Sequence, residues 1–197
     1  MKTSANLIAV ILCGGQSARM GEAKYLLAYH GLPQYKWLSQ LCLTGLGLPT
    51  YLSCQTSQAA EIENGCELIF DQETFAQGGP MTGLLSAAAL HPGKPILLLA
   101  CDYPHLALSD IRDLVLAFEE NGKSTCLVHP KTHLEEPLLA IYAASDLAKI
   151  KDNFFKDKRS LRQFLHTANH TNIAARNTQV IKSFDTPNDR LNFKGQA

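Results

Sequence analysis

Residues 7–24 read LIAVILCGGQSARMGEAK. The first part of this segment is a run of aliphatic residues, and the second part is rich in glycine and carries two cations. A continuous aliphatic run of this length predicts a β-strand that is covered on both faces, as in a parallel sheet. Ligands of such sheets collect at the carboxyl ends of the strands, where this glycine-rich part would lie. The segment therefore predicts an α/β fold with a binding loop directly after its first strand.

The residue types of this loop suit the binding of phosphate. Gly14 and Gly15 permit close backbone approach and positive φ angles, so successive amides can converge on an anion. Ser17 adds a hydroxyl donor, while Arg19 and Lys24 can neutralise charge on two phosphates. The loop matches neither the Walker A pattern nor G-x-G-x-x-G. The alternative is a plain glycine-rich turn with two solvated cations, and the ordered series of functional residue types disfavours it.

Strand patterns alternate with helical patterns along the chain. Alternation of this kind predicts a three-layer α/β/α sandwich around a mostly parallel, mixed central sheet. We expect Ser109 to cap the start of a helix at 109–121, which Asn121 and Gly122 would end. Strands are expected at 7–12, 50–53, 68–70, 96–100, 125–128, 137–142 and 180–184. Helices are expected at 34–43, 81–90, 109–121, 143–154, 160–167 and 187–191.

Length and composition bound the class of protein. The 197 residues contain no internal repeat and no clear linker, so we expect one domain over residues 1–197. Lys plus Arg and Asp plus Glu both total 18, which argues against binding nucleic acid through bulk charge. No apolar run reaches the roughly 20 residues that cross a bilayer. The six cysteines are scattered without a C-x-x-C pair, so we expect reduced thiols in a cytoplasmic protein.

Two acidic residues follow predicted strands. Asp102 comes directly after the strand at 96–100, in the sequence C-D-Y-P. A lone aspartate at such a place is more often a turn or capping residue. Its pairing with a phosphate loop favours a ligand of Mg²⁺ instead, because a metal can bridge the oxygens of bound phosphates. Asp71 follows the strand at 68–70 and precedes GGPMTG at 78–83, where it is either part of a nucleotide site or a solvated turn residue.

The pattern L-x-G-G-x-S-x-R-M-G-x-x-K at 12–24 resembles the signature loop of the MobA-like nucleotidyltransferases. C-D-x-P at 101–104 and G-P-x-x-G at 79–83 are similar to further motifs of this family, as are R-S-L at 159–161 and T-P-x-D at 186–189. The resemblance implies a Rossmann-like nucleotidyltransferase fold. It also implies Mg²⁺-dependent transfer of GMP from GTP to the phosphate of molybdopterin, with release of pyrophosphate.

The resemblance also implies roles for individual residues. The implied catalytic residues are Arg19, Lys24 and Asp102, and the implied metal ligand is Asp102. The implied nucleotide-binding residues are Leu12, Cys13, Gly14, Gly15, Ser17, Lys24, Asp71, Gly79 and Asp102. The implied partners are GTP and a phosphorylated small-molecule acceptor, molybdopterin, with no nucleic acid or membrane partner and with a monomer or a weak homo-oligomer as the assembly.

The sequence departs from the family pattern at a few positions. Ala23 stands where the family commonly has Asp, 53–55 contains no Asn where guanylyl-transferring members have one, and Ser183 and Asp185 stand where Asn is expected. The glycine pair favours guanine over cytosine as the base. Three alternatives stay open: a cytidylyltransferase, a sugar-1-phosphate nucleotidyltransferase, and a nucleotide-binding regulator without catalysis.

Overall fold

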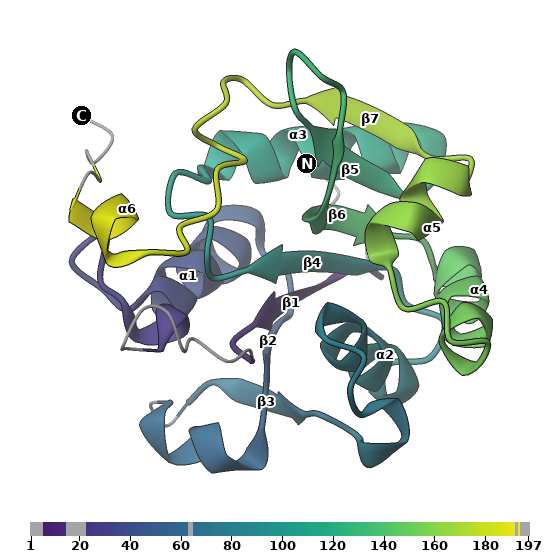
Figure 1. The fold of residues 1–197 in the computed structure, drawn as a ribbon, viewed down its shortest axis with the longest axis horizontal. Helices are drawn as coiled ribbons and strands as arrows, with labels where there is room; N and C mark the ends of the chain where they lie inside the picture. Colours follow the sequence, from purple (N-terminus) through teal and green to yellow (C-terminus); the bar gives the residue numbers. More distant parts are fainter. Residues whose placement is uncertain (1–5, 15–22, 63–64, 192, 194–197) are drawn as a thin grey trace.

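The computed structural model describes residues 6–14, 23–62, 65–191 and 193, and Figure 1 shows their central sheet with helices on both faces. The strands are β1 (Ile8–Leu12), β2 (Thr50–Cys54), β3 (Glu67–Phe70), β4 (Ile96–Ala100), β5 (Thr125–Val128), β6 (Glu135–Tyr142) and β7 (Thr171–Ala174). Their order in the sheet is β3-β2-β1-β4-β6-β5-β7. Strand β6 is antiparallel to both neighbours, and all other neighbouring strands are parallel. The expected mixed, mostly parallel sheet is confirmed.

The helices form the two outer layers. They are α1 (Gln34–Leu46), α2 (Pro80–Leu90), α3 (Leu108–Asn121), α4 (Ala144–Phe155), α5 (Leu161–Thr167) and α6 (Pro187–Leu191), with short 3₁₀ helices η1 (Lys24–Leu26), η2 (Thr56–Glu61) and η3 (Glu73–Phe75). Helices α1 and α3 contact each other on one face of the sheet, and α2 and α4 contact each other on the other face. The predicted three-layer α/β/α architecture is therefore confirmed.

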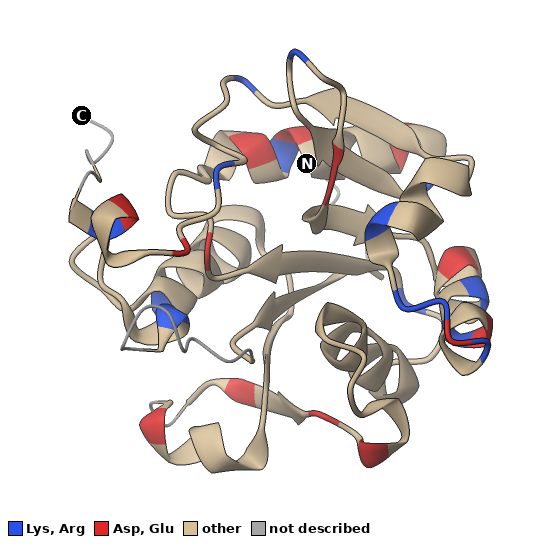
Figure 2. Cartoon of the chain, in the orientation of Figure 1, with Lys and Arg blue, Asp and Glu red and all other residues tan. Residues whose placement is uncertain are grey.

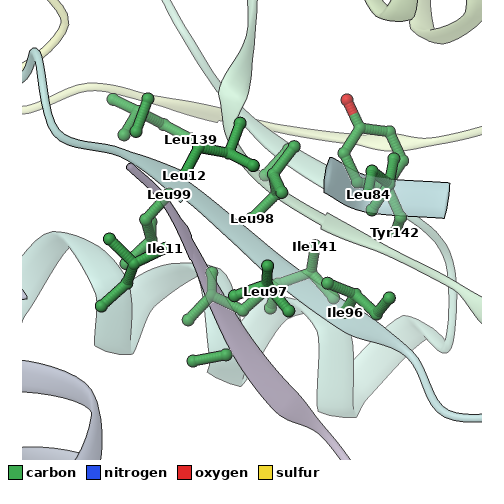
Figure 3. Close-up of a cluster of buried hydrophobic side chains, with 14 of the residues drawn as sticks. Ile11, Leu12, Leu84, Ile96, Leu97, Leu98, Leu99, Leu139, Ile141 and Tyr142 are labelled. Atoms are coloured by element: carbon green, nitrogen blue, oxygen red, sulfur yellow. The ribbon is translucent and has the colours of Figure 1, made fainter. Parts of the chain in front are cut away.

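Strands β1 and β4 are the centre of the hydrophobic core (Figure 3). Every residue of both strands is buried, and Leu97, Leu98 and Leu99 have no exposed surface. Successive side chains of a strand point to opposite faces, so an aliphatic residue at every position requires cover on both faces. Helix α2 provides Leu84 on one face, and α1 packs against β1 on the other. Figure 2 accordingly shows no charged residue on β1 or β4.

The carboxyl ends of these strands lie next to one another. Leu12 at the end of β1 is in parallel register with Ala100 at the end of β4 and with Ser53 on β2. The Cys13–Gly14 turn and the Cys101–Asp102 turn therefore leave the sheet at the same edge. The fold thus brings the Cys13–Gly14 turn and Asp102 together, although they are far apart in the sequence.

Two details of the sequence interpretation are wrong. Residues 180–184 form no strand, and the seventh strand is β7, which pairs with β5 at the edge of the sheet. The N–H of Phe184 donates to the Asp102 carbonyl (2.8 Å) and not to a neighbouring strand of the sheet. Ala107, not Ser109, is the N-cap of α3, and the side chain of Asp110 accepts the Ala107 N–H (2.9 Å). An acidic side chain in the first turn thus satisfies the backbone donor that precedes the helix.

Two further observations concern the chain as a whole. In the part of the chain that the structure describes, no helix has the length and apolar character that a membrane span requires. No disulfide joins any two of the six cysteines, all of which are described.

Helix α2 approaches β1 and β2 closely at Gly83. A Cβ atom at this position would lie 2.4 Å from the Ser53 hydroxyl oxygen and 2.5 Å from a methyl carbon of Leu12. Real Cβ atoms essentially never come this close to another heavy atom. Glycine is therefore required here by packing, although it weakens a helix interior.

We expect Gly83→Ala to lower the free energy of unfolding by about 1–3 kcal/mol, because the added methyl overpacks the α2–sheet interface. Alanine is otherwise favoured over glycine in a helix by about 1 kcal/mol, so the sign of the effect is informative. Urea denaturation measures it. Gly45→Ala, at an exposed position of α1, is the control. Its methyl would meet the flexible end of the Leu108 side chain, so a smaller loss of stability is expected there. Equal or higher stability of Gly83→Ala would contradict the packing described.

Candidate active site

A cavity of about 490 Å³ opens at the carboxyl ends of β1, β2 and β4. Its size is within the range of roughly 300–1,000 Å³ that is typical of small-molecule sites. Seven of the nucleotide-site residues predicted from the sequence belong to the part of the chain that the structure describes. All seven line this cavity: Leu12, Cys13, Gly14, Lys24, Asp71, Gly79 and Asp102. The predicted residues Gly15, Ser17 and Arg19 lie outside the described residues, and their roles remain predictions.

The start of the glycine loop is held by hydrogen bonds from β2 and η2. The Cys13 N–H donates to the Ser53 carbonyl (2.8 Å), and the Gln58 side-chain amide donates to the Cys13 carbonyl (3.2 Å). Gln58 also accepts the Gln55 N–H (2.8 Å), which fixes η2 beside the loop. Sequence reasoning missed Gln58, although its spacing from Gln55 is that of a capping box.

Ser53 and Asp71 form a polar pair on the cavity wall. The Ser53 hydroxyl donates to an Asp71 carboxylate oxygen (3.3 Å). Partial burial raises the pKa of Asp71, and the hydrogen bond from Ser53 opposes this shift. The other carboxylate oxygen of Asp71 would lie 3.7 Å from a Cβ at Gly14, so the glycine turn and the carboxylate share one part of the cavity. This pair can recognise N–H donors on a ligand.

Thr82 fixes the glycine turn that precedes α2. Its hydroxyl donates to the Phe75 carbonyl (2.6 Å) and accepts the Gly78 N–H (3.1 Å). Gly79 has a φ of 56°, a conformation that glycine adopts without steric cost. Thr82 also lines the cavity, and sequence reasoning did not single it out.

Asp102 has an unsatisfied carboxylate oxygen. Among the described residues, its Oδ1 is one of the few buried side-chain atoms without a hydrogen-bond partner. Burial raises the pKa of Asp102 from its ordinary value of 3.8 to about 6, while nearby Lys24 lowers it. A buried polar atom without a partner costs free energy, and such atoms are often found at functional sites. A carboxylate oxygen with open valence beside a cavity fits the hard oxygen ligand that Mg²⁺ prefers.

Lys24 lines this cavity and contacts the carboxylates of Asp102 and Asp185. Its ammonium nitrogen is 3.8 Å from Asp102 Oδ2 and forms a closer ion pair with Asp185. The Phe184 N–H donates to the Asp102 carbonyl, which brings the C-terminal segment against the end of β4. Figure 2 shows acidic positions on both of these segments. Sequence reasoning noted Asp185 as a departure from the family pattern, but it did not predict this contact with Lys24.

A doubly wound sheet with a cavity at its carboxyl edge is the arrangement of nucleotide-binding α/β proteins. The comparison with family models makes the class specific. The MobA-like NTP transferase domain matches residues 9–173, and the chain belongs to this family. The predicted family is confirmed, and nucleotidyl transfer is its class of reaction.

Relatives of known name agree with the family. A molybdenum cofactor guanylyltransferase of Serratia proteamaculans is 25% identical over 190 residues, which cover 95% of this chain and 94% of the relative. A molybdenum cofactor biosynthesis bifunctional protein of Synechocystis is 30% identical over 138 residues, 69% of this chain and 39% of that longer protein.

Solved structures agree with the fold. Molybdopterin-guanine dinucleotide biosynthesis protein A from Archaeoglobus fulgidus has a TM-score of 0.73 and 22% identity, covering 93% of this chain and 94% of its own. A nucleotidyl transferase from Methanothermobacter has a TM-score of 0.74 and 15% identity, covering 95% of each chain. At these identities the likeness concerns the fold alone, and it confirms the Rossmann-like class.

We expect Asp102→Asn to become more stable relative to the unchanged protein as the pH rises from about 4 to about 7. Between pH 3.8 and about 6 the folded state binds more protons at Asp102 than the unfolded chain does, so the unchanged protein loses stability across this window. Because one pKa unit corresponds to about 1.4 kcal/mol, the relative gain is on the order of 3 kcal/mol.

Urea denaturation at several pH values measures this difference. Asp113→Asn is the control for the loss of a carboxylate away from the cavity, because Asp113 of α3 pairs with Arg176 and does not line the cavity. A stability difference for Asp102→Asn that is independent of pH would contradict the raised pKa.

Proposed function

We propose that the protein transfers GMP from GTP to the phosphate of molybdopterin and releases pyrophosphate. The observation that carries the proposal is the joint position of Lys24 and Asp102 at one end of a cavity whose wall also holds Ser53 and Asp71. Such a cavity can take the triphosphate at the charged end and the base at the polar pair. The name of the Serratia relative supports the choice of guanine and of molybdopterin.

In this reaction a phosphate oxygen of the acceptor attacks the α-phosphorus of GTP. A bond from this oxygen to phosphorus forms, and the bond from the α-phosphorus to the bridging oxygen of pyrophosphate breaks. The acceptor phosphate is already ionised, so no strong general base is required. Positioning and electrostatic stabilisation therefore account for most of the rate enhancement.

The residues of the chain would divide these tasks. Lys24, together with Arg19 on the glycine loop, would neutralise the charge that develops on the leaving pyrophosphate. The unsatisfied Oδ1 of Asp102 would hold Mg²⁺. This metal, when bound, supplies Lewis-acid stabilisation of the phosphate oxygens. The amide of Gly14 would orient the triphosphate at the end of β1.

The base would be selected by the Ser53–Asp71 pair. Guanine presents adjacent N–H donors, from its ring nitrogen and its amino group, which a carboxylate can accept together. Adenine, cytosine and uracil lack this pair of adjacent donors. Ser53 and Asp71 would thus supply base selectivity in a chain that has no Asn in 53–55.

GTP is expected to raise the melting temperature of the protein more than ATP, CTP or UTP in the presence of Mg²⁺. A ligand that binds only the folded state stabilises it in proportion to the logarithm of its concentration over Kd. Thermal unfolding with each nucleotide at one concentration provides the comparison. A larger shift with CTP would support a cytidylyltransferase and contradict the proposed base.

Asp102→Asn is expected to reduce pyrophosphate release from GTP and molybdopterin by at least about 10²-fold, as loss of a key electrostatic group does in other enzymes. A coupled pyrophosphate assay measures the rate, and Asp113→Asn should retain the activity of the unchanged protein. GTP binding by a protein that releases no pyrophosphate with molybdopterin or with sugar 1-phosphates would identify a nucleotide-binding regulator instead. Full turnover by Asp102→Asn would contradict the role of Asp102.

A further inference from the structure

We propose that Asp185 is the positioning residue for Lys24. Its carboxylate holds the lysine ammonium at the mouth of the nucleotide cavity, in the place where the ammonium receives the triphosphate. This inference rests on the proposed function, and it explains how the Lys24 side chain is positioned for catalysis.

The geometry around Lys24 carries the inference. The Asp185 carboxylate lies within hydrogen-bonding distance of the ammonium group, whereas Asp102 Oδ2 is 3.8 Å away. Asp185 and Lys24 are 161 residues apart in the sequence. The pair therefore exists only because the C-terminal segment folds back to lie beside Lys24.

Asp185 is itself held in place by its neighbours. Its second carboxylate oxygen accepts the Ser183 hydroxyl (2.7 Å), and its N–H donates to the Asp189 carboxylate at the start of α6 (3.2 Å). The preceding residue, Phe184, is bonded through its N–H to the Asp102 carbonyl (2.8 Å). The carboxylate of Asp185 is thus fixed relative to the end of β4 and to Asp102.

A fixed partner is useful to a lysine that must meet a phosphate. Ordering a free lysine side chain costs rotamer entropy, and a side chain that is already ordered does not incur this cost during binding. An ammonium group has three N–H donors, so one such group can bond a carboxylate and a phosphate oxygen at the same time. Asp185 also keeps Lys24 at a distance from Asp102, whose Oδ1 stays available for a ligand.

The neighbour of Lys24 in the sequence cannot do this task. Residue 23 is alanine, which offers no carboxylate beside the lysine. Asp185 provides the missing acid from the opposite end of the chain. Two of the positions at which the sequence departs from the family pattern, 23 and 185, therefore meet at one side chain, and the second would compensate for the first.

Asp185→Asn tests the inference, because it removes the charge and keeps the size of the side chain. We expect kcat for pyrophosphate release to fall about 10- to 100-fold while KM for GTP changes less than about 3-fold, since a displaced catalytic group chiefly slows the chemical step. The ammonium ¹H–¹⁵N signal of Lys24 in the nucleotide-free protein, protected in the ion pair, should be lost. The double variant Ala23→Asp/Asp185→Asn should recover at least about a third of the lost kcat.

Asp113→Asn is the matched control, because it also removes one partner of an ion pair that binds the C-terminal third to the rest of the chain. It should change neither kcat nor the Lys24 signal. An Asp185→Asn variant that keeps the Lys24 signal overturns the positioning role. The positioning role is also overturned if the double variant does not recover kcat and Asp185→Asn has a lowered melting temperature. In that case Asp185 has a structural role.

The NMR measurement needs no nucleotide, so the two proposals can fail separately. An unchanged protein that releases no pyrophosphate overturns the proposed function. A Lys24 signal that is insensitive to Asp185→Asn overturns the inference, whatever the enzyme does with GTP.

Discussion

The parallel, in-register pairing of β1 with β4 is the constraint on which the rest of the structure depends. Both strands are buried on both faces, so they occupy the centre of the sheet and end at the same edge. The turn after β1 and the turn after β4 then open into one cavity. A glycine loop and a carboxylate that are far apart in the sequence thereby become the two halves of one site.

This position has an energetic cost that the fold tolerates. Asp102 emerges from an aliphatic strand, so its carboxylate is poorly hydrated, and its pKa is raised to about 6. Its Oδ1 lacks a hydrogen-bond partner within the described chain. In natural proteins, a polar atom without a hydrogen-bond partner is found more often at a functional site, where a bound ligand can supply the missing partner. The same feature that destabilises the free protein makes Asp102 suitable for binding a cation.

The sequence predicted best where one physical effect dominates. The aliphatic runs of β1 and β4 can be satisfied only in the centre of a sheet, and both strands were placed within one residue. Edge strand β7, with the sequence TNIA, is only partly buried, so its pattern did not distinguish it from a loop. The apolar residues of 180–184 were mistaken for a strand, because Val180 and Phe184 are buried in a segment without a ladder.

The candidate site was predictable residue by residue but not as a network. Local motifs identified Gly14, Asp71 and Asp102 as lining residues, because each follows the carboxyl end of a strand in the parallel part of the sheet. The contact of Lys24 with Asp185 depends on the path of the last third of the chain, which no local pattern encodes. Gln58 and Thr82 act through backbone groups of the two glycine turns, so only the folded structure reveals them.

A crystal structure of the protein with Mg²⁺ and a non-hydrolysable GTP analogue tests the central claim most directly. The account predicts guanine against Ser53 and Asp71, the phosphates extending along the Cys13–Gly14 turn to Lys24, and the metal on Asp102. A nucleotide bound outside this cavity, or with its phosphates directed away from Lys24 and Asp102, would contradict it.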